Sequence, residues 1–223
     1  MGITYNPKVV TDGLVLCVDA ASKRSYPGTG TTWTDLSSGE NSITLNNGPS
    51  FSDDNGGVIE FDGTDDNGEV PHSIGISGND TRTFCLWFYP ISVGNNYGVL
   101  ETGTPSRDKH FAIEGYTSTS MTFNGWYHDF NFVSNGYNKW QYLCLLHDGS
   151  QVRLYIDTEL RGSRDGTINT AETYSYTTRG LSLAMGRGGQ ESNIRVSSLD
   201  VYNKALSDDE IRQNYNATRG RFQ

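Results

Sequence analysis

The chain lacks any long apolar segment. No stretch approaches the ~20 consecutive apolar residues that a membrane-spanning helix needs. A secretion leader would continue into an apolar core, whereas this chain continues from its first residues into polar positions. We therefore expect no membrane partner and no secretion signal at the start of the chain.

Positive charge is also scarce. The chain has 17 Lys and Arg against 26 Asp and Glu, which gives a net charge of −9 and a pI of about 4.8. A nucleic-acid-binding domain shows a basic patch or stripe, and none is visible in the sequence. An acidic surface also disfavours anionic membranes and phosphate-rich molecules. We expect no nucleic acid among the partners.

Cysteine is rare, and its spacing excludes the usual cysteine motifs. The three residues, Cys17, Cys85 and Cys144, form no C-x-x-C pair of the kind found in metal and redox sites. Each lies in an apolar run, where a free thiol acts as a small hydrophobic side chain. The sequence therefore predicts three free, buried thiols and no need for an oxidising compartment.

Familiar catalytic signals are absent as well. The four histidines are scattered, with no two at metal-ligand spacing, and no G-x-S-x-G nucleophile elbow occurs. The sequence thus indicates a non-enzymatic domain.

Glycine and aromatic residues are abundant instead. The chain has 26 Gly and 12% aromatic residues, a composition that suits short strands joined by tight turns. Residues 83–89 alternate between two apolar sets, and residues 140–157 read as two strands around a turn that contains Asp148 and Gly149. These patterns predict an all-β fold of the two-sheet sandwich type.

One short helix is expected near the end of the chain. Ser207 and Glu210 have the spacing of a capping box, in which each side chain bonds the backbone of the other residue. We predict a helix over Ser207–Tyr215. No linker divides the chain, so residues 1–223 are expected to form a single domain, with an N-terminal arm (1–12) and a C-terminal helix and tail (207–223).

Several segments together carry a family resemblance. They are Asp12-Gly13-Leu14-Val15-Leu16, Trp33-Thr34-Asp35-Leu36-Ser37-Ser38-Gly39, Phe61-Asp62-Gly63-Thr64-Asp65-Asp66, Trp140, Asp148-Gly149 to Asp157, and Val201 to Ile211. In this order they resemble the laminin G-like branch of the concanavalin A-like lectin/glucanase superfamily. The end, Asn214 to Phe222, also resembles virion proteins of tailed phages. The resemblance implies a jelly-roll sandwich of two antiparallel sheets and a role in carbohydrate recognition, adhesion or virion architecture.

The same resemblance raises the question of glycoside cleavage. Glu60, Asp62 and Asp65 form E-x-D-x-x-D, which is similar to the catalytic E-x-D-x-x-E of related glucanases. The last carboxylate is one methylene shorter and lies beyond Gly63, in an expected turn. We therefore predict no glycosidase activity.

Calcium is a candidate cofactor. Hard cations prefer several oxygen ligands, and Asp35, Asn41 and Asp62 lie in turns rich in such oxygens. The alternative is ordinary turn chemistry on an acidic surface. Calcium-binding relatives place an Asp early in the last strand, where this chain has Ser197, and this departure weakens the calcium hypothesis.

The richest candidate for ligand binding is the segment 116–137. Its residues Tyr116, Trp126, Tyr127 and His128 lie among Asn, Ser and Gly. Aromatic faces stack on sugar rings, and the same residue types also form protein interfaces. The alternative is that these aromatic residues belong to the core of the sandwich.

These observations favour a non-enzymatic structural or adhesion protein of a virion. It could decorate a capsid or form part of a tail or fibre, binding other virion proteins and copies of itself, with a trimer expected and cell-surface glycans as further partners. Segments 116–137 and 215–222 are the candidate contact surfaces. A secreted, extracellular carbohydrate-binding module is the alternative, and a glycoside hydrolase the third hypothesis.

Overall fold

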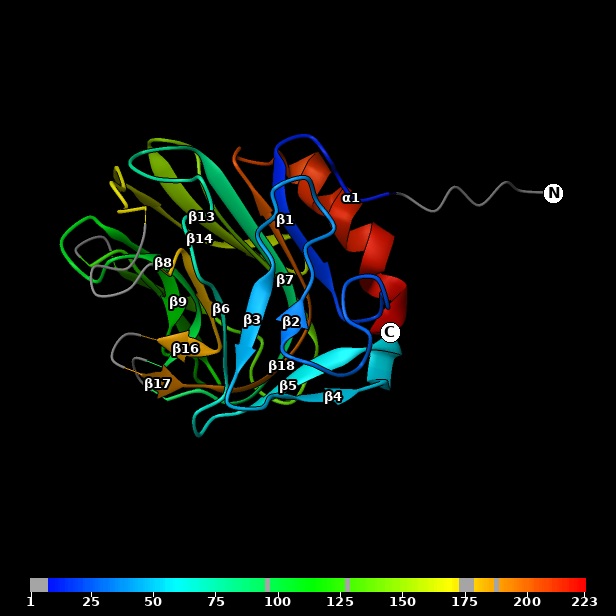
Figure 1. Cartoon of the computed structure of the whole chain (residues 1–223). Coiled ribbons are helices and arrows are strands. Elements are labelled where there is room, and N and C mark those ends of the chain that lie inside the picture. Colours follow the sequence, from blue (N-terminus) through cyan, green and yellow to red (C-terminus); the bar gives the residue numbers. More distant parts are fainter. Residues whose placement is uncertain (1–7, 95–96, 127–128, 173–178, 187–188) are drawn as a thin grey trace.

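The fold consists of two large β-sheets and one helix. The computed structural model describes residues 8–94, 97–126, 129–172, 179–186 and 189–223. Within these residues the chain forms two eight-stranded antiparallel sheets and a two-stranded ribbon, with a helix against one side (Figure 1). The predicted all-β sandwich with a short C-terminal helix is confirmed.

Sheet A contains the longest strands. Its order is β14 (Glu159–Asp165), β13 (Gln151–Ile156), β12 (Gln141–His147), β7 (Arg82–Ser92), β18 (Asn193–Tyr202), β5 (Val58–Asp62) and β4 (Ser50–Ser52), and β1 (Leu14–Asp19) also pairs with β18. The predicted hairpin is β12–β13, whose turn is held by the carboxylate of Asp148 accepting from the amides of Ser150 and Gln151.

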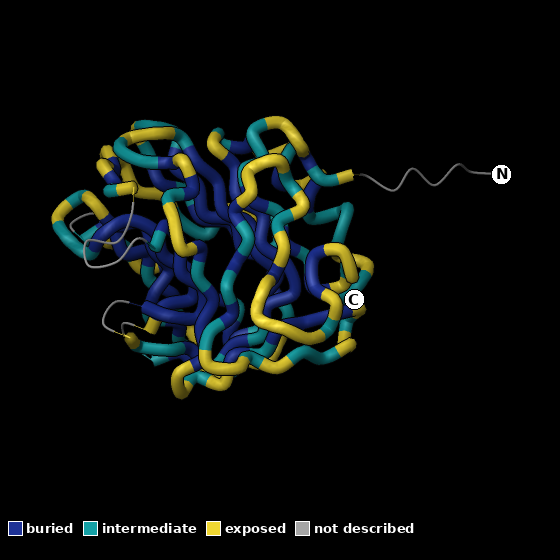
Figure 2. Tube along the Cα trace, viewed as in Figure 1, coloured by how far each residue is buried: buried dark blue, intermediate teal, exposed yellow. Residues whose placement is uncertain are grey.

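Sheet B lies over the other side of the core. Its order is β11 (Phe130–Val133), β10 (Ser120–Asn124), β9 (His110–Glu114), β8 (Gly98–Gly103), β15 (Leu181–Leu183), β6 (Asn67–Val70), β3 (Ile43–Asn46) and β2 (Thr32–Trp33). The ribbon joins β16 (Met185–Gly186) to β17 (Gln190–Glu191). Buried residues follow the strands, and exposed residues gather in the connecting turns (Figure 2).

Alternation along the strands builds two separate apolar layers. In β7, Phe84, Leu86 and Phe88 join the core between the sheets. Their neighbours Cys85 and Trp87 point to the opposite face and join a second cluster. Both faces of β7 are therefore apolar because another part of the chain packs on the outer face.

That cover is the helix α1 (Asp208–Thr218), which lies on the outer face of sheet A (Figure 1). Its capping box is present as predicted, with the Ser207 hydroxyl accepting from the Glu210 amide. The helix continues beyond the predicted end at Tyr215 to Thr218. Among the described residues, no helix is long and apolar enough to cross a bilayer.

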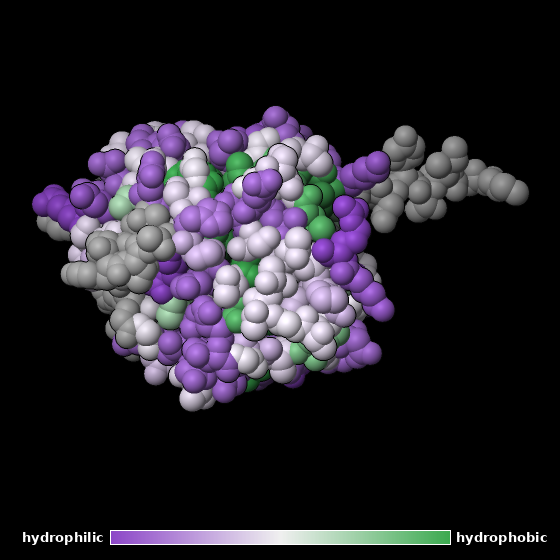
Figure 3. All heavy atoms as spheres, in the orientation of Figure 1, coloured by the Kyte–Doolittle hydropathy of each residue, from purple (hydrophilic) through white to green (hydrophobic). Residues whose placement is uncertain are grey.

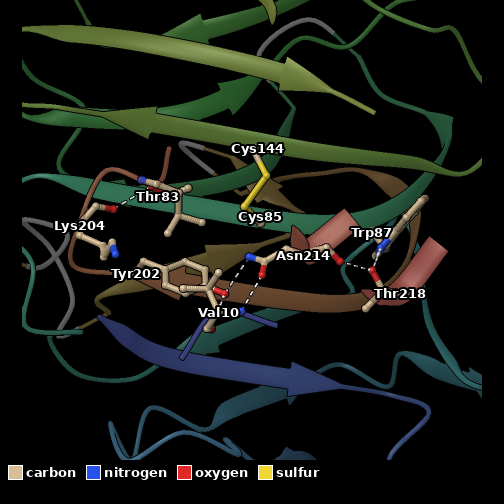
Figure 4. The surroundings of a disulfide bond; sticks show 10 residues. Val10, Thr83, Cys85, Trp87, Cys144, Tyr202, Lys204, Asn214 and Thr218 are labelled. Atoms are coloured by element: carbon tan, nitrogen blue, oxygen red, sulfur yellow. Dashed lines mark hydrogen bonds between the residues drawn. A yellow bond between two sulfur atoms is a disulfide. The ribbon is translucent and has the colours of Figure 1, made fainter. Parts of the chain in front are cut away.

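Asn214 ties the helix to the sheet. Its side-chain oxygen accepts from the Val10 amide at 2.8 Å, and its nitrogen donates to the Tyr202 hydroxyl at 2.9 Å (Figure 4). Val10 belongs to the predicted N-terminal arm, so this part of the arm packs beneath the helix. Residues 1–7 of the arm lie outside the described residues.

The prediction of three free thiols is wrong for two of them. Cys85 on β7 and Cys144 on β12 are directly opposite in the strand register and form a disulfide, drawn in Figure 4. Cys17 is free. The sequence shows that both cysteines lie in apolar strands, but it does not show that these two strands pair in this register.

Candidate functional site

The structure describes two of the four predicted ligand residues of segment 116–137, and these two have different surroundings. Tyr116 is fully buried, and its hydroxyl donates to the Gly136 carbonyl at 2.9 Å. It therefore belongs to the core and offers no ring face to a ligand, a correction to the predicted role. Trp126 is half-buried, with its ring 6.4 Å from that of His110. Tyr127 and His128 lie outside the described residues.

The predicted calcium ligands separate into two places. Both carboxylate oxygens of Asp35 accept bonds within its own turn, among them one from the Asn41 amide at 2.9 Å. The side-chain nitrogen of Asn41 donates to the Val15 carbonyl at 2.7 Å. Asp35 and Asn41 are thus better described as turn residues.

Asp62 lies elsewhere, with Asp65 and Asp66. One carboxylate oxygen from each of the three lies within 4.8 Å of the others. Asp66 is buried, and burial raises the pKa of its carboxyl. Asp62 stays a predicted calcium ligand, because these contacts do not test that role.

A row of polar and aromatic side chains crosses the outer face of sheet A beside the helix. The strand register places Ser50 of β4 opposite Glu60 of β5, Glu60 opposite Arg195 of β18, and Arg195 opposite Tyr89 of β7. Paired residues point to the same side of a sheet. With strands about 4.8 Å apart, the row spans about 14 Å.

The row is held by contacts along its length. Arg195 Nε lies 2.9 Å from Glu60 Oε1, and its guanidinium group lies 5.5 Å from the centre of the Tyr89 ring. The Tyr89 ring meets the edge of Trp140 at 5.6 Å. We call Ser50, Glu60, Arg195, Tyr89 and Trp140 the Tyr89 face.

The Tyr89 face is accessible and borders a hollow. The side chains of Arg195 and Glu60 keep 35% and 31% of their exposure, and Tyr89 and Trp140 are half-buried. A hollow of about 280 Å³ adjoins the row, and Asp62, Ile91 and Asn193 also line it. Aromatic rings beside a fixed ion pair and open space can bind a ligand that has both an apolar face and hydroxyl groups.

Sequence reasoning found only part of this face. It singled out Glu60 and Asp62, and the alternation in residues 83–89 places Tyr89 on the face opposite to Phe88. It missed Arg195, because residues 193–195 precede the apolar run that marks the last strand. It also could not show that residues 50, 60, 89 and 195 form one row.

The carboxylates near this face are engaged by neighbouring groups. Glu60 is engaged by Arg195 and by the Ser50 hydroxyl, which donates at 3.3 Å. Asp62 accepts from the Thr64 amide at 2.7 Å. Asp65 groups with Asp62 and Asp66.

Comparisons with known proteins agree with the fold. Residues 62–212 match a laminin G-like family model described as the concanavalin A-like lectin/glucanases superfamily. A search of curated proteins finds no match.

Several solved structures are similar in fold. A mutant Trypanosoma rangeli sialidase with trans-sialidase activity superposes with a TM-score of 0.69 at 14% identity, over 96% of this chain and 34% of the sialidase. Domain 4 of the extracellular arabinanase AbnA of Geobacillus stearothermophilus, in complex with arabinotriose, gives 0.68 at 12% identity, over 92% of this chain and 99% of that domain.

The binding domain of botulinum neurotoxin serotype D gives a TM-score of 0.66 at 12% identity, over 92% of this chain and 52% of that one. The chain therefore corresponds to about a third of the sialidase and half of the toxin domain, but to almost all of the arabinanase domain. At these identities the likeness shows the fold alone.

Proposed function

Because the chain belongs to the concanavalin A-like lectin/glucanases superfamily, we propose that it is a carbohydrate-binding module that binds sugars on the Tyr89 face without cleaving them. The observation that carries the proposal is the row from Ser50 to Tyr89, in which an ion pair and an aromatic ring share one accessible surface.

The chemistry of the row suits a sugar. One side of a sugar ring carries mainly C–H groups, which lose contact with water when they stack on an aromatic ring. The hydroxyl groups at the ring edge need donors and acceptors, and Arg195 and Glu60 supply both kinds. Their mutual contact holds each group in place before the ligand arrives, which lowers the entropy cost of binding.

Binding without cleavage is supported by the state of the carboxylates. A retaining glycosidase needs two carboxyl groups about 5–5.5 Å apart, one of which donates a proton. Glu60 is engaged by Arg195 and Ser50, and Asp62 accepts from the Thr64 amide. The similarity in fold to a domain whose structure is in complex with arabinotriose supports a binding role as well.

The test is binding of the purified chain to a panel of plant, bacterial and animal oligosaccharides, followed by calorimetry on the best ligand. Tyr89→Ala should weaken binding by at least about tenfold, because a stacked aromatic anchor typically contributes more than 1 kcal/mol. Arg195→Ala should weaken it similarly. Tyr97→Ala is the matched control, because Tyr97 is a partly exposed tyrosine that precedes β8 of sheet B.

Two results would overturn the proposal. One is the absence of any binding across the panel by a folded chain. The other is binding that Tyr89→Ala and Arg195→Ala leave unchanged. Release of shorter sugars that Glu60→Gln abolishes would instead favour a glycoside hydrolase.

We further propose that the module serves adhesion or architecture in a virion, with secretion as an extracellular carbohydrate-binding module as the alternative. The resemblance of residues 214–222 to tailed-phage proteins supports the virion. The buried Cys85–Cys144 disulfide supports the extracellular alternative, because such bonds persist mainly in oxidising surroundings.

A further inference from the structure

The chain continues past α1 into a tail that borders the Tyr89 face. A single turn of 3-10 helix, η2 (Arg219–Arg221), follows the helix, and Phe222 comes directly after it. The Phe222 ring stacks on Trp87 with ring centres 4.1 Å apart, and it contacts the Trp140 ring at 4.8 Å. Trp140 is itself part of the Tyr89 face. The tail therefore touches the proposed sugar site through one of its aromatic residues.

The strand register shows on which side of the face the tail lies. Trp87 and Tyr89 are two residues apart on the outer face of β7, so their rows are about 7 Å apart. Continuing the β7–β12 register by one residue places Trp140 opposite Tyr89. Phe222 packs on Trp87 and Trp140, and it therefore borders the Tyr89 face on its Trp87 side.

Arg221 fixes the tail at this position. Its Nη1 lies 2.8 Å from the Asp19 carboxylate, its Nε donates to the Asn55 carbonyl at 2.9 Å, and its Nη2 donates to the Ser197 hydroxyl at 2.5 Å. The Arg221 carbonyl accepts from the Asn55 side chain at 2.6 Å. Hydrogen bonds that involve a charged group are stronger than neutral ones. The backbone and the side chain next to Phe222 are thus both held, which fixes the place of its ring.

The residues on which Phe222 packs are held as well. The Trp87 indole donates to the Thr218 hydroxyl at 2.7 Å (Figure 4), so the end of α1 is tied to β7. Trp140 contacts Phe222 and Tyr89 at the same time, with ring centres 4.8 and 5.6 Å away. A side chain that is already packed by two neighbours loses little conformational entropy when a ligand binds. Phe222 therefore prepares the Trp140 ring for a ligand.

The Tyr89 face is longer than a single sugar. It crosses from β4 through β5, β18 and β7 to the residue before β12, which is a length of about 19 Å at ordinary strand spacing. The hollow adjoins Ser50, Glu60 and Arg195, whereas Trp140 lies at the other end of the row, beyond Tyr89. A single sugar bound at the hollow cannot reach Trp140, but a chain of sugars can.

We propose that Phe222 is a positioning residue, which holds Trp140 as the far end of a site for an extended glycan chain. The inference rests on the proposed sugar binding, to which it adds the size of the ligand and a residue that acts on it from the tail. Phe222 keeps the Trp140 ring beside Tyr89. A chain that begins at the hollow then gains an aromatic contact at its other end.

The experiment measures how affinity depends on chain length. The best ligand of the oligosaccharide panel is used as a series of lengths that begins with the single sugar, and calorimetry gives each affinity. Affinity of the wild-type chain should rise with length. Trp140→Ala should weaken binding of the longest ligand by about tenfold and leave the shortest binding ligand unchanged. Phe222→Ala should have the same pattern with a loss of about fivefold, because the freed Trp140 side chain must be ordered when the ligand binds.

Further variants separate positioning from a loss of fold. Phe222→Tyr keeps the ring and should retain the affinity for long chains. Arg221→Ala frees the tail without removing the ring and should weaken long-chain binding in the same way as Phe222→Ala. Phe222→Ala combined with Trp140→Ala should bind long chains no more weakly than Trp140→Ala alone. Arg219→Ala is the matched control, because Arg219 is an exposed tail residue whose guanidinium group lies over Tyr215 instead.

An equal loss for short and long ligands in Phe222→Ala would overturn the proposal, because a general change of the fold would then explain it. So would long-chain binding that Phe222→Ala leaves unchanged, or an affinity that does not rise with length. In these cases sugar binding that Tyr89→Ala weakens would still stand, whereas the absence of any binding would overturn both proposals. Arg221→Ala decides the matter if Phe222→Ala does not fold.

Discussion

Asp200 lies on β18 directly opposite Cys17 of β1, and it is buried. Burial raises the pKa of its carboxyl from an ordinary 3.8 to about 7, although a hydrogen bond with the Cys17 thiol acts in the opposite direction. Burial, together with Asp200, raises the pKa of the Cys17 thiol as well. The fold therefore favours a protonated, neutral carboxyl at this position.

This raised pKa predicts how stability depends on pH. The folded state holds a proton that the unfolded state releases near 3.8, so the contribution of Asp200 is fully present below that pH and is lost as pH rises to about 7. Asp200→Asn keeps the side chain neutral at every pH. It should raise the free energy of unfolding at about pH 8 by up to about 4 kcal/mol relative to wild type, and by much less at about pH 4.

Urea unfolding at a series of pH values measures the difference between the two proteins. Asp53→Asn, at an exposed carboxyl, is the control and should show no such pH-dependent gain. A gain from Asp200→Asn that is the same at both pH values would contradict the expected titration.

Single residues were the hardest features to predict from the sequence. Tyr116 and Tyr89 are the same residue type, yet Tyr116 is fully buried and Tyr89 lies on an accessible face. The regular alternation along the long strand β7 indicates on which face of the sheet Tyr89 lies. Tyr116 follows the end of β9 in an irregular stretch, where no period tells which way a side chain points.

At the scale of elements, the sequence predicted where along the chain the helix and tail lie, but it did not predict all of the contacts that they make. The capping box marks the start of α1 in the sequence. The tail was expected to offer a contact surface, but Phe222 stacks on Trp87 at 4.1 Å, and the Trp87 indole donates to the Thr218 hydroxyl at 2.7 Å. Tyr215 also packs on Trp87. These residues are therefore engaged within the chain itself.

The disulfide joins two neighbouring strands beneath this helix. Thiol counting in denaturant without reductant should give one thiol, from Cys17, and full reduction should give three. Because the bond closes a loop across a sequence separation of 59, its reduction should lower the free energy of unfolding by about 4 kcal/mol.

Cys17→Ser should give no thiol before reduction, whereas Cys85→Ser should give two. Three thiols in the unreduced wild-type chain would instead restore the expectation made from the sequence.

At the scale of the whole molecule, the sandwich could be predicted because the sequence pattern that specifies it lies within each strand and turn. A period of two along many strands, with turn residues between them, specifies sheets with a buried face. The Tyr89 face could not be predicted, because it depends on pairing between strands far apart in the chain. Glu60 and Arg195, for example, meet only through the β5–β18 register.

Assembly is the remaining property of the whole molecule, and we propose that copies of the chain associate. On the face drawn in Figure 3, apolar residues form small separate groups among hydrophilic ones. Two large apolar side chains are nevertheless exposed on edge strands: Val133 of β11 is 63% exposed, and Leu160 of β14 is 54% exposed. Edge strands with exposed apolar residues favour pairing with another chain.

Light scattering should therefore give a mass of three times 24.6 kDa for the purified chain, as expected for a symmetric trimer in a fibre or decoration. Val133→Asp combined with Leu160→Asp should lower the mass to that of a monomer, because like charges would face each other in the contact. Leu36→Asp, at a partly exposed residue distant from both edge strands in the sequence, is the control. Mass spectrometry of purified particles should also detect the chain. A monomer at every concentration, absent from particles but retained on a glycan column, would favour the secreted module over the virion protein.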